Sequence, residues 1–273
     1  MTQHPAPAYV HGHHDSVLRS HAWRTAENSA AYLLPDLHPD LTVLDVGCGP
    51  GTITIDLARR VAPGVVVGID ASDAPLDGAR KDAEAQGVDN VRFGVADVGR
   101  LPFAAGTYDV VHAHQVLQHI ADPVAALREM ARVCKPGGIV AARDVVASSV
   151  AWYPDDPALA DWHDLYQQVL RGGGGQPDAG RYLVAWAHAA GLEDVTPSAS
   201  AWCFSTPEDR AWWGETWADR VTHSDFAKQA MDRGLADRDE LATLANAWRR
   251  WVDQPDGWFA MLHGEIRCRV GEG

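Results

Sequence analysis

The chain has 273 residues, of which 46% are hydrophobic and 22% charged, a composition typical of a globular protein rather than a disordered one. The formal net charge of −14 argues against binding to nucleic-acid phosphates or anionic lipid, and no apolar run is as long as the roughly 20 residues of a membrane span. The N-terminus lacks the layout of a signal peptide, so we expect a cytoplasmic protein. Its four cysteines are too scattered for a disulfide framework or a zinc site: Cys48, Cys134, Cys203 and Cys268.

The N-terminal region predicts one helix ahead of the first strand. Residues 1–14 are rich in proline and histidine and are expected to be irregular. Asp15 or Ser16 is a candidate cap for a helix that continues to Leu34 and stops before Pro35. The histidines near the start have no partnered carboxylate pattern, so we predict no metal site there: His11, His13 and His14.

Strands and helices alternate between residues 41 and 146. Short apolar runs predict strands over Leu41–Val46, Val65–Ile69, Val91–Val95, Tyr108–Ala113 and Ile139–Val146. Helices are predicted over Thr52–Val61, over Ser72–Gln86 with Ser72 or Asp73 as cap, and from Asp122-Pro123 to the stop at Lys135-Pro136-Gly137-Gly138. This alternation favours an α/β fold with a parallel sheet and helices on both faces.

The second half of the chain has a different character, because ten of the eleven tryptophans lie between Trp152 and Trp258. Helices are predicted over Asp155–Arg171, Ala179–Ala190 and from Thr206 to about Val252, and strands over Asp194–Phe204 and Trp258–Val270. Because Trp212, Trp213 and Trp217 cannot share one helix face, we expect at least one of them to face a pocket or a partner.

The segment Val43 to Gly51 (VLDVGCGPG) carries the strongest functional signal. An apolar strand leads into Gly47, Gly49 and Gly51, after which a helix begins. Glycines permit a tight turn and a close approach of ligand to backbone, and the helix offers free N–H groups. The spacing departs from the G-x-G-x-x-G fingerprint of dinucleotide enzymes. The carboxylate of Asp45 beside the loop suits an ammonium group better than a pyrophosphate.

Two further acidic residues follow the next two strands. Asp70 can accept hydrogen bonds from both hydroxyls of a ribose, a role shared by proteins that bind nicotinamide dinucleotides and by proteins that bind adenosylmethionine. Asp97 can accept from an adenine amino group, with the Val98 N–H beside the base.

Five motifs in this order and spacing resemble class I S-adenosylmethionine-dependent methyltransferases: VLDVGCGPG, GIDAS, ADVGRLPF, YDVVHAHQVLQHIADP and ARVCKPGG. The similarity covers about residues 40–146 and is closest to the ubiquinone/menaquinone-biosynthesis type, the methyltransferase type 11-like subgroup. It implies a Rossmann-like, seven-stranded, mostly parallel sheet with an antiparallel last strand. Asp194–Phe204 and Trp258–Val270 would supply strands six and seven.

The resemblance also implies the cofactor, S-adenosyl-L-methionine, and most of its contacts. His114 and Gln115 would line the cleft shared by cofactor and acceptor, and Arg24 is a candidate partner for the cofactor carboxylate, with an ordinary salt bridge as the alternative. His112 is read as a packed core histidine, and His119 as a brace for the next helix or a cofactor contact. The full expected cofactor set is Arg24, Asp45, Gly47, Cys48, Gly49, Gly51, Asp70, Ala71, Asp97, Val98, His114, Gln115 and His119.

The expected organisation is a single methyltransferase domain over residues 1–273. Within it, residues 1–36 would cover the cofactor, 37–146 form the cofactor-binding core, and 147–192 and 206–256 form helical lids over the acceptor. Methyl transfer is an in-line displacement that mainly requires alignment, so a base is needed only if the acceptor must lose a proton. His114 is the first candidate for that base, followed by Tyr166 or His163.

The most favoured function is methyl transfer to a small-molecule acceptor, with no nucleic-acid or membrane partner. Two alternatives remain: an adenosylmethionine-binding protein that does not methylate, and a nicotinamide-dependent oxidoreductase. The sequence leaves open the identity of the acceptor, the methylated atom and the oligomeric state, with a homodimer as one alternative.

Overall fold

The computed structural model describes residues 23–271, which fall into two compact units. The sheet unit comprises residues 23–145, 178–200 and 263–271, and the aromatic unit comprises residues 146–177 and 201–262. The predicted cap at Asp15 or Ser16 and the histidines at positions 11, 13 and 14 lie outside the described residues.

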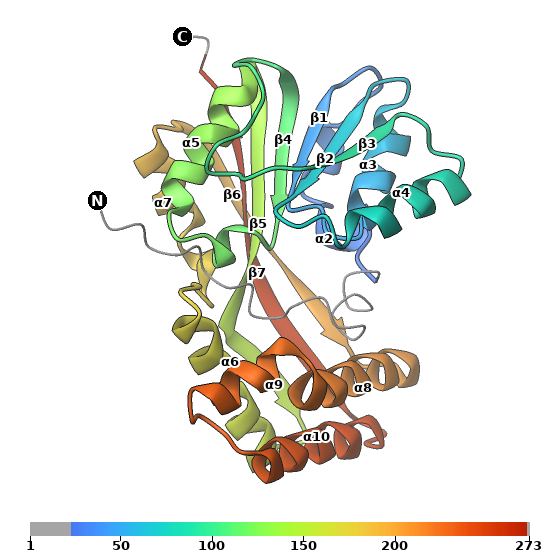
Figure 1. The fold of residues 1–273 in the computed structure, drawn as a ribbon, viewed down its shortest axis with the longest axis vertical. Helices are drawn as coiled ribbons and strands as arrows, with labels where there is room; N and C mark the ends of the chain where they lie inside the picture. Colours follow the sequence, from blue (N-terminus) through green and yellow to red (C-terminus); the bar gives the residue numbers. More distant parts are fainter. Residues whose placement is uncertain (1–22, 272–273) are drawn as a thin grey trace. The chain divides into compact units, whose positions relative to one another are not determined.

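Seven strands form one sheet in the order β3-β2-β1-β4-β5-β7-β6 (Figure 1). The strands are β1 (Val43–Val46), β2 (Val66–Asp70), β3 (Val91–Val95), β4 (Tyr108–His114), β5 (Cys134–Tyr153), β6 (Asp194–Phe204) and β7 (Trp258–Arg269). β1 to β5 pair in parallel. β7 runs against β5, since Gly137 N donates to Val270 O at 2.8 Å and Val270 N donates to Gly138 O at 2.9 Å. The predicted mostly parallel sheet with a reversed last strand is therefore confirmed.

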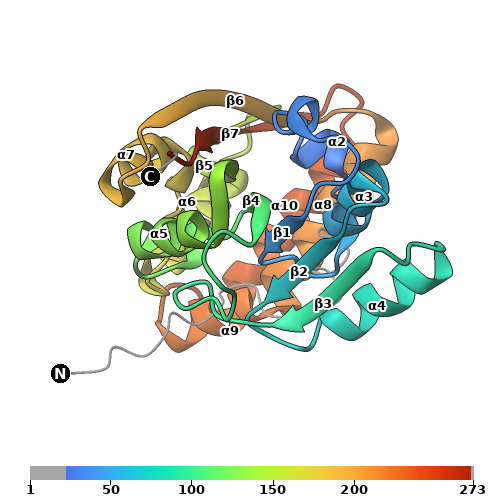
Figure 2. The same cartoon turned by 90° about the horizontal axis from the view of Figure 1, so that it is seen from above.

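Helices cover both faces of the sheet unit, as predicted. Figure 2 shows α2 (Ala26–Ser29) and α3 (Thr52–Val61) on one side, with α5 (Pro123–Val133) and α7 (Leu183–Ala190) on the other. Side chains alternate between two hydrophobic clusters: Val43 and Val110 pack with α3, whereas Leu44 and Val111 pack with α5. By the same alternation, Asp45, His112, His114 and Arg143 lie on the α3 face of the sheet.

The predicted helix ending at Leu34 is wrong over its described part. Thr25 caps a helix of only four residues, α2, because its hydroxyl accepts from Asn28 N while the Asn28 side chain accepts from Thr25 N. A turn follows, and then a short 3-10 helix, η1 (Leu34–Asp36), that contains Pro35. Thr25 thus marks a helix start, so the predicted helix does not run unbroken through this position.

Other boundaries also differ from prediction, those of α4 and β5 among them. α4 (Leu76–Ala85) begins four residues later than Ser72, because Ser72 N donates to the Asp70 carboxylate and Ala74 N donates to the Ser72 hydroxyl. β5 has 20 residues rather than the eight predicted, and includes the proline–glycine segment predicted as the stop of the preceding helix. The register against β4 shifts between Tyr108 and Val110, which accommodates the extra residues of that segment.

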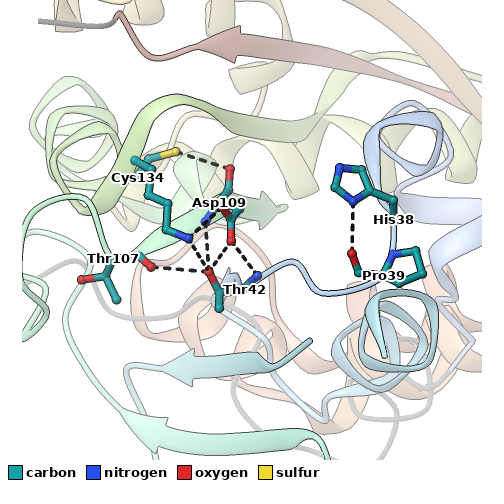
Figure 3. A network of polar contacts seen from close by, with 7 residues as sticks. His38, Pro39, Thr42, Thr107, Asp109 and Cys134 are labelled. Carbon is teal, nitrogen blue, oxygen red and sulfur yellow. Dashed lines mark hydrogen bonds and ion pairs between the residues drawn. The ribbon is translucent and has the colours of Figure 1, made fainter. Parts of the chain in front are cut away.

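The amino ends of the strands are held by a polar network shown in Figure 3. The Asp109 carboxylate accepts from Thr42 N at 2.8 Å and from its hydroxyl at 2.6 Å, and pairs with Lys135 Nζ at 2.8 Å. Partial burial raises the pKa of Asp109, but the bonds from Lys135 and Thr42 outweigh it and lower that pKa below its usual value. β1, β4 and β5 are fixed at this end, so the carboxyl ends of the same strands remain for a functional site.

The aromatic unit contains α6 (Pro157–Gly172), α8 (Pro207–His223), α9 (Asp225–Asp232) and α10 (Arg238–Val252). Its centre is an aromatic cluster around Trp162. The ring centroid of Trp162 lies 4.6 Å from that of Trp217 and 4.7 Å from that of Trp248, and both pairs meet edge to face. Trp213 and Trp217 are buried, and the half-buried Trp212 lies against Phe204, so packing occupies these three rings. Within residues 23–271, no helix is both long and apolar enough to cross a bilayer.

Candidate functional site

The glycine loop between β1 and α3 adopts a backbone that only glycine accepts easily. Gly47, Gly49 and Gly51 have φ of +67°, +53° and +78°. A Cβ at Gly47 would lie 2.3 Å from Val116 Cγ2, and one at Gly51 would lie 2.8 Å from Ala79 Cβ. The loop therefore combines left-handed geometry with close packing, and small side chains are required for both reasons.

Asp70, at the end of β2, ties the glycine loop to the start of the next segment. Its carboxylate accepts from Gly49 N at 3.0 Å through Oδ2 and from Ser72 N at 3.0 Å through Oδ1. Each oxygen can still accept a further bond, and Ala71 beside it is exposed. Cys48 N donates to Ile69 O at 2.9 Å, and burial raises the pKa of the Cys48 thiol, so this cysteine is not an activated nucleophile.

Asp45 lies beneath the glycine loop rather than at its surface. Only 2% exposed, it accepts from the Thr54 hydroxyl at 2.6 Å and from His112 Nδ1 at 2.8 Å. Asp45 thereby links β1, α3 and β4, while a direct bond to a ligand ammonium stays a prediction. His112 is fully buried, as expected of a core histidine, and within the described residues its Nε2 has no hydrogen-bond partner.

Asp97 and Val98 follow β3, as the sequence indicates. Asp97 is exposed, and its Oδ1 accepts from Gly99 N at 2.8 Å in a tight turn. Val98 is buried in the cluster beneath α5. The exposed Asp97 carboxylate can accept a hydrogen bond from a ligand amino group, while the contact of the Val98 N–H with the base stays a prediction.

The carboxyl end of β4 brings four predicted residues together: Arg24, His114, Gln115 and His119. Gln115 has φ of +54°, an uncommon conformation for a residue with a side chain, and Arg24 Nη2 donates to its Oε1 at 3.0 Å. Burial, with the cations Arg143 and Arg24 next, lowers the pKa of His114 well below 6.5. Burial and Arg24 lower the pKa of His119 to about 4. Both imidazoles are therefore uncharged at neutral pH.

The sequence analysis did not identify the polar residues that β5 and β7 contribute to this face. Arg143 is 1% exposed, and its Nε lies 3.1 Å from the Ser200 hydroxyl and 3.2 Å from Glu265 Oε1. Glu265 also accepts from Ser198 at 2.7 Å. Because Glu265 and Ile266 alternate along β7, Glu265 shares the Arg143 face, whereas Ile266 packs with α5.

Further buried groups adjoin the Arg143–Glu265 pair. Desolvation, with Glu265 next, raises the pKa of Tyr32 well above 10, and within residues 23–271 its hydroxyl has no hydrogen-bond partner. Asp144 is fully buried, and desolvation raises its pKa to about 7. His263, from β7, stacks on His114 with ring centroids 6.4 Å apart. Charged residues at central strand positions were the only sequence signal for this cluster.

The other two candidate bases belong to a different unit. His163 and Tyr166 lie on α6 of the aromatic unit, where His163 Nε2 is 2.7 Å from Ala147 O and Tyr166 stacks on Trp162. In the described part of the chain, no group of three histidine, cysteine or acidic side chains is arranged to hold a metal ion. Of the three candidates, His114 alone shares the sheet unit with the glycine loop.

A family model and a relative of nearly the same length identify the family of this chain. Residues 37–197 match the family described as a methyltransferase domain. The chain is 37% identical over 269 residues to an uncharacterized methyltransferase of Schizosaccharomyces pombe, covering 94% of this chain and 95% of that protein. Over 99 residues it is 40% identical to a ubiquinone biosynthesis O-methyltransferase of Acinetobacter baylyi, covering 36% of this chain and 41% of that protein. The crystal structure of the YcgJ protein from Bacillus subtilis is similar in fold, with a TM-score of 0.59 and 21% identity over 90% of this chain and 100% of that one.

Proposed function

The chain belongs to the methyltransferase-domain family and uses S-adenosylmethionine as its methyl donor, and from this premise we propose that it methylates a hydroxyl group of a small molecule with His114 as the general base. The observation that carries the proposal is a buried, uncharged histidine at the carboxyl end of β4, in the same unit as the glycine loop. In parallel α/β sheets, ligands bind at that end of the strands.

The residues of the glycine loop fit the donor. Gly47 and Gly51 leave no room for a Cβ against Val116 and Ala79, and their left-handed backbone makes the tight turn between β1 and α3 that a donor-binding loop needs. Asp70 keeps acceptor capacity for ribose hydroxyls after bonding Gly49 N and Ser72 N. We assign the adenine edge to Asp97 and Val98, and the carboxylate of the methionine moiety to Arg24.

When bound, S-adenosylmethionine supplies an activated methyl group on a sulfonium. The chain's residues then have to align the acceptor, exclude water and take up a proton. A hydroxyl acceptor must lose its proton, whereas a neutral amine attacks through its own lone pair. His114 can take that proton because burial and the neighbouring Arg143 and Arg24 keep it uncharged.

Two observations favour oxygen over nitrogen as the methylated atom. The first is the presence of a base that amine methylation would not need. The second is the name of the Acinetobacter baylyi relative, an O-methyltransferase of ubiquinone biosynthesis, which matches this chain over 99 residues in total. That match is too short to transfer a substrate, so we propose the class of acceptor atom and no particular compound.

We further propose that residues 147–192 and 206–256 act as lids over the acceptor; of these, 147–177 and 206–256 belong to the aromatic unit and 178–192 to the sheet unit. The indole rings of the aromatic unit, which meet edge to face, suit a planar or apolar molecule. The net charge of −14 disfavours a nucleic-acid acceptor, and four free cysteines fit a reducing, cytoplasmic setting. A homodimer stays a prediction.

The proposal is tested with radiolabelled S-adenosylmethionine and matched acceptor sets, for example 3,4-dihydroxybenzoate, its dimethyl ether and 3,4-diaminobenzoate, extended to aliphatic alcohols and amines. Label should enter hydroxylated compounds and neither the blocked nor the amino analogues. His114→Asn should lower kcat by about 100-fold, within the usual range for loss of a general base, and leave the affinity for S-adenosylhomocysteine nearly unchanged. Methylation of amines alone, or an unchanged kcat in His114→Asn, would overturn the proposal.

A further inference from the structure

Three side chains from distant parts of the sequence form one chain of hydrogen bonds in the sheet unit. Arg24, which precedes α2, donates from Nη2 to Gln115 Oε1 at 3.0 Å. Gln115, which follows β4, lies with its Nε2 2.9 Å from Nε2 of His263 on β7. His263 is fully buried and stacks on His114 at an interplanar angle of 25°.

The chemistry of arginine fixes which atom donates and which accepts in each of these hydrogen bonds. A guanidinium has donors and no acceptor, so the Gln115 atom that faces Arg24 must be the carbonyl oxygen. The atom that faces His263 must then be the amide nitrogen, which donates. His263 Nε2 must therefore present its lone pair, and a neutral imidazole with that lone pair carries its proton on Nδ1.

We propose that Gln115 is a positioning residue that, oriented by Arg24, holds His263 as the neutral tautomer protonated on Nδ1. The Nε2 lone pair of His263 is then occupied by Gln115, so this nitrogen does not act as a base. Of the two stacked imidazoles, His114 alone remains to accept a proton. This division of roles rests on the proposed function, whereas the tautomer of His263 does not.

The backbone conformation of Gln115 supports its assignment as a positioning residue. Its φ of +54° is uncommon for a residue with a Cβ, and its N–H donates to Arg143 O on β5 at 2.7 Å. The neighbouring strand therefore holds Gln115 in a conformation that glycine or asparagine would adopt more easily. The full burial of His263 removes water as a competing partner for its ring nitrogen.

A second arginine–glutamine–histidine set on α6 gives a contrast within the same molecule. Arg171 Nη2 donates to Gln167 Oε1 at 2.8 Å, and Gln167 Nε2 lies 3.3 Å from His163 Nε2. Here Ala147 O is 2.7 Å from the same His163 nitrogen, and a carbonyl oxygen can only accept. His163 must therefore be protonated on Nε2, the opposite tautomer, and Gln167 does not set its state.

Long-range ¹⁵N–¹H NMR of the histidine rings in the full-length resting protein tests the inference, with the His263 signals assigned by their loss in His263→Asn. We expect Nε2 of His263 to resonate as an unprotonated, pyridine-like nitrogen and Nδ1 as a protonated, pyrrole-like one. In Gln115→Glu the carboxylate has no donor, so Nε2 of His263 should move to the protonated region. A wild-type His263 protonated on Nε2, or an unchanged tautomer in Gln115→Glu, overturns the inference.

Two variants of Arg24 and one control separate positioning from general damage to the fold. Arg24→Lys keeps a donor and should preserve the Nδ1–H tautomer, whereas Arg24→Gln lets the Gln115 amide turn and should give a mixture of tautomers. Gln167→Glu, the matched change on α6, should leave the His263 signals unchanged. Equal effects of Arg24→Lys and Arg24→Gln on the His263 signals would contradict the proposal that Arg24 orients the Gln115 amide. The NMR samples contain neither a methyl donor nor a methyl acceptor. Failure of the methylation assay would therefore leave the assignment of the His263 tautomer intact.

Discussion

The buried carboxyl group of Asp144 should make the free energy of unfolding depend on pH. Asp144 Oδ1 accepts from Gln118 N at 3.2 Å, and within the described residues Oδ2 has no hydrogen-bond partner. Desolvation, opposed by backbone bonds from Gln118 and Leu117, raises its pKa from 3.8 to about 7. Between these values the folded protein binds more protons than the unfolded chain, so stability falls as pH rises through that window.

The size of the effect follows from the shift in pKa. A rise of about 3 units, at a little over 1 kcal/mol per unit, corresponds to ~4 kcal/mol, of which roughly 2 to 3 kcal/mol falls between about pH 5 and about pH 8. Asp144→Asn keeps the acceptor for Gln118 N and removes the titration. The stability of the variant relative to wild type should therefore rise by roughly 2 to 3 kcal/mol from the lower to the higher pH.

Urea unfolding of both proteins at the two pH values, followed by far-ultraviolet circular dichroism, measures this difference. Other titrating groups are common to the two proteins and cancel in the comparison. A stability difference that stays constant with pH would show that Asp144 is ionised in the folded protein, and would refute the reasoning from its burial.

Three further predictions concern the loop, the buried ion pair and the base. Gly47→Ala and Gly87→Ala share a φ of +67°, but nothing lies within 4 Å of a Cβ at Gly87. Gly87→Ala should therefore lower the free energy of unfolding by about 1 kcal/mol, and Gly47→Ala should lower it by more. Gly47→Ala should also weaken the binding of S-adenosylhomocysteine, measured by calorimetry, by about tenfold. Equal effects of the two variants on stability and on binding would contradict the clash with Val116. Glu265→Gln leaves the buried Arg143 guanidinium without its counter-charge and should lower the free energy of unfolding in urea by about 3 kcal/mol. Adding Arg143→Met to the same chain should restore most of that loss. If the losses of the two substitutions add instead, the two residues are not coupled as an ion pair. Because the pKa of His114 lies well below 6.5, kcat/KM should stay level as pH is lowered through 6.5, and a fall centred there would contradict the burial argument.

Much of the sheet could be predicted because its strands have strong local signals. Val91–Val95 and Asp194–Phe204 match prediction at both ends, and Asp122 and Thr206 cap helices where expected. Apolar runs bounded by glycine, proline and capping residues need no tertiary information. The residues around Thr25 failed this reasoning, because their apolar spacing resembles a helix while Thr25 and Asn28 bond locally instead.

The glycine loop and Asp70 could be located from the sequence because consecutive residues build that part of the site. The polar face of β5 and β7 could not, because Arg143 and Glu265 are 122 positions apart and become partners only when β7 inserts between β5 and β6. His263 was missed for the same reason: its relation to Gln115 depends on strand order and on the left-handed turn after β4. Strand periodicity identifies which face a residue occupies, but not which distant residue shares it.

The most direct test of the central claim is isothermal titration calorimetry with S-adenosylmethionine, S-adenosylhomocysteine and NADH, on wild type and on Asp70→Ala. The account predicts binding of both adenosyl ligands in the micromolar range, loss of that binding in Asp70→Ala, and none for NADH. Absence of adenosyl-ligand binding to wild type, or equal binding by Asp70→Ala, would contradict the assignment of the glycine loop and Asp70 as the donor site.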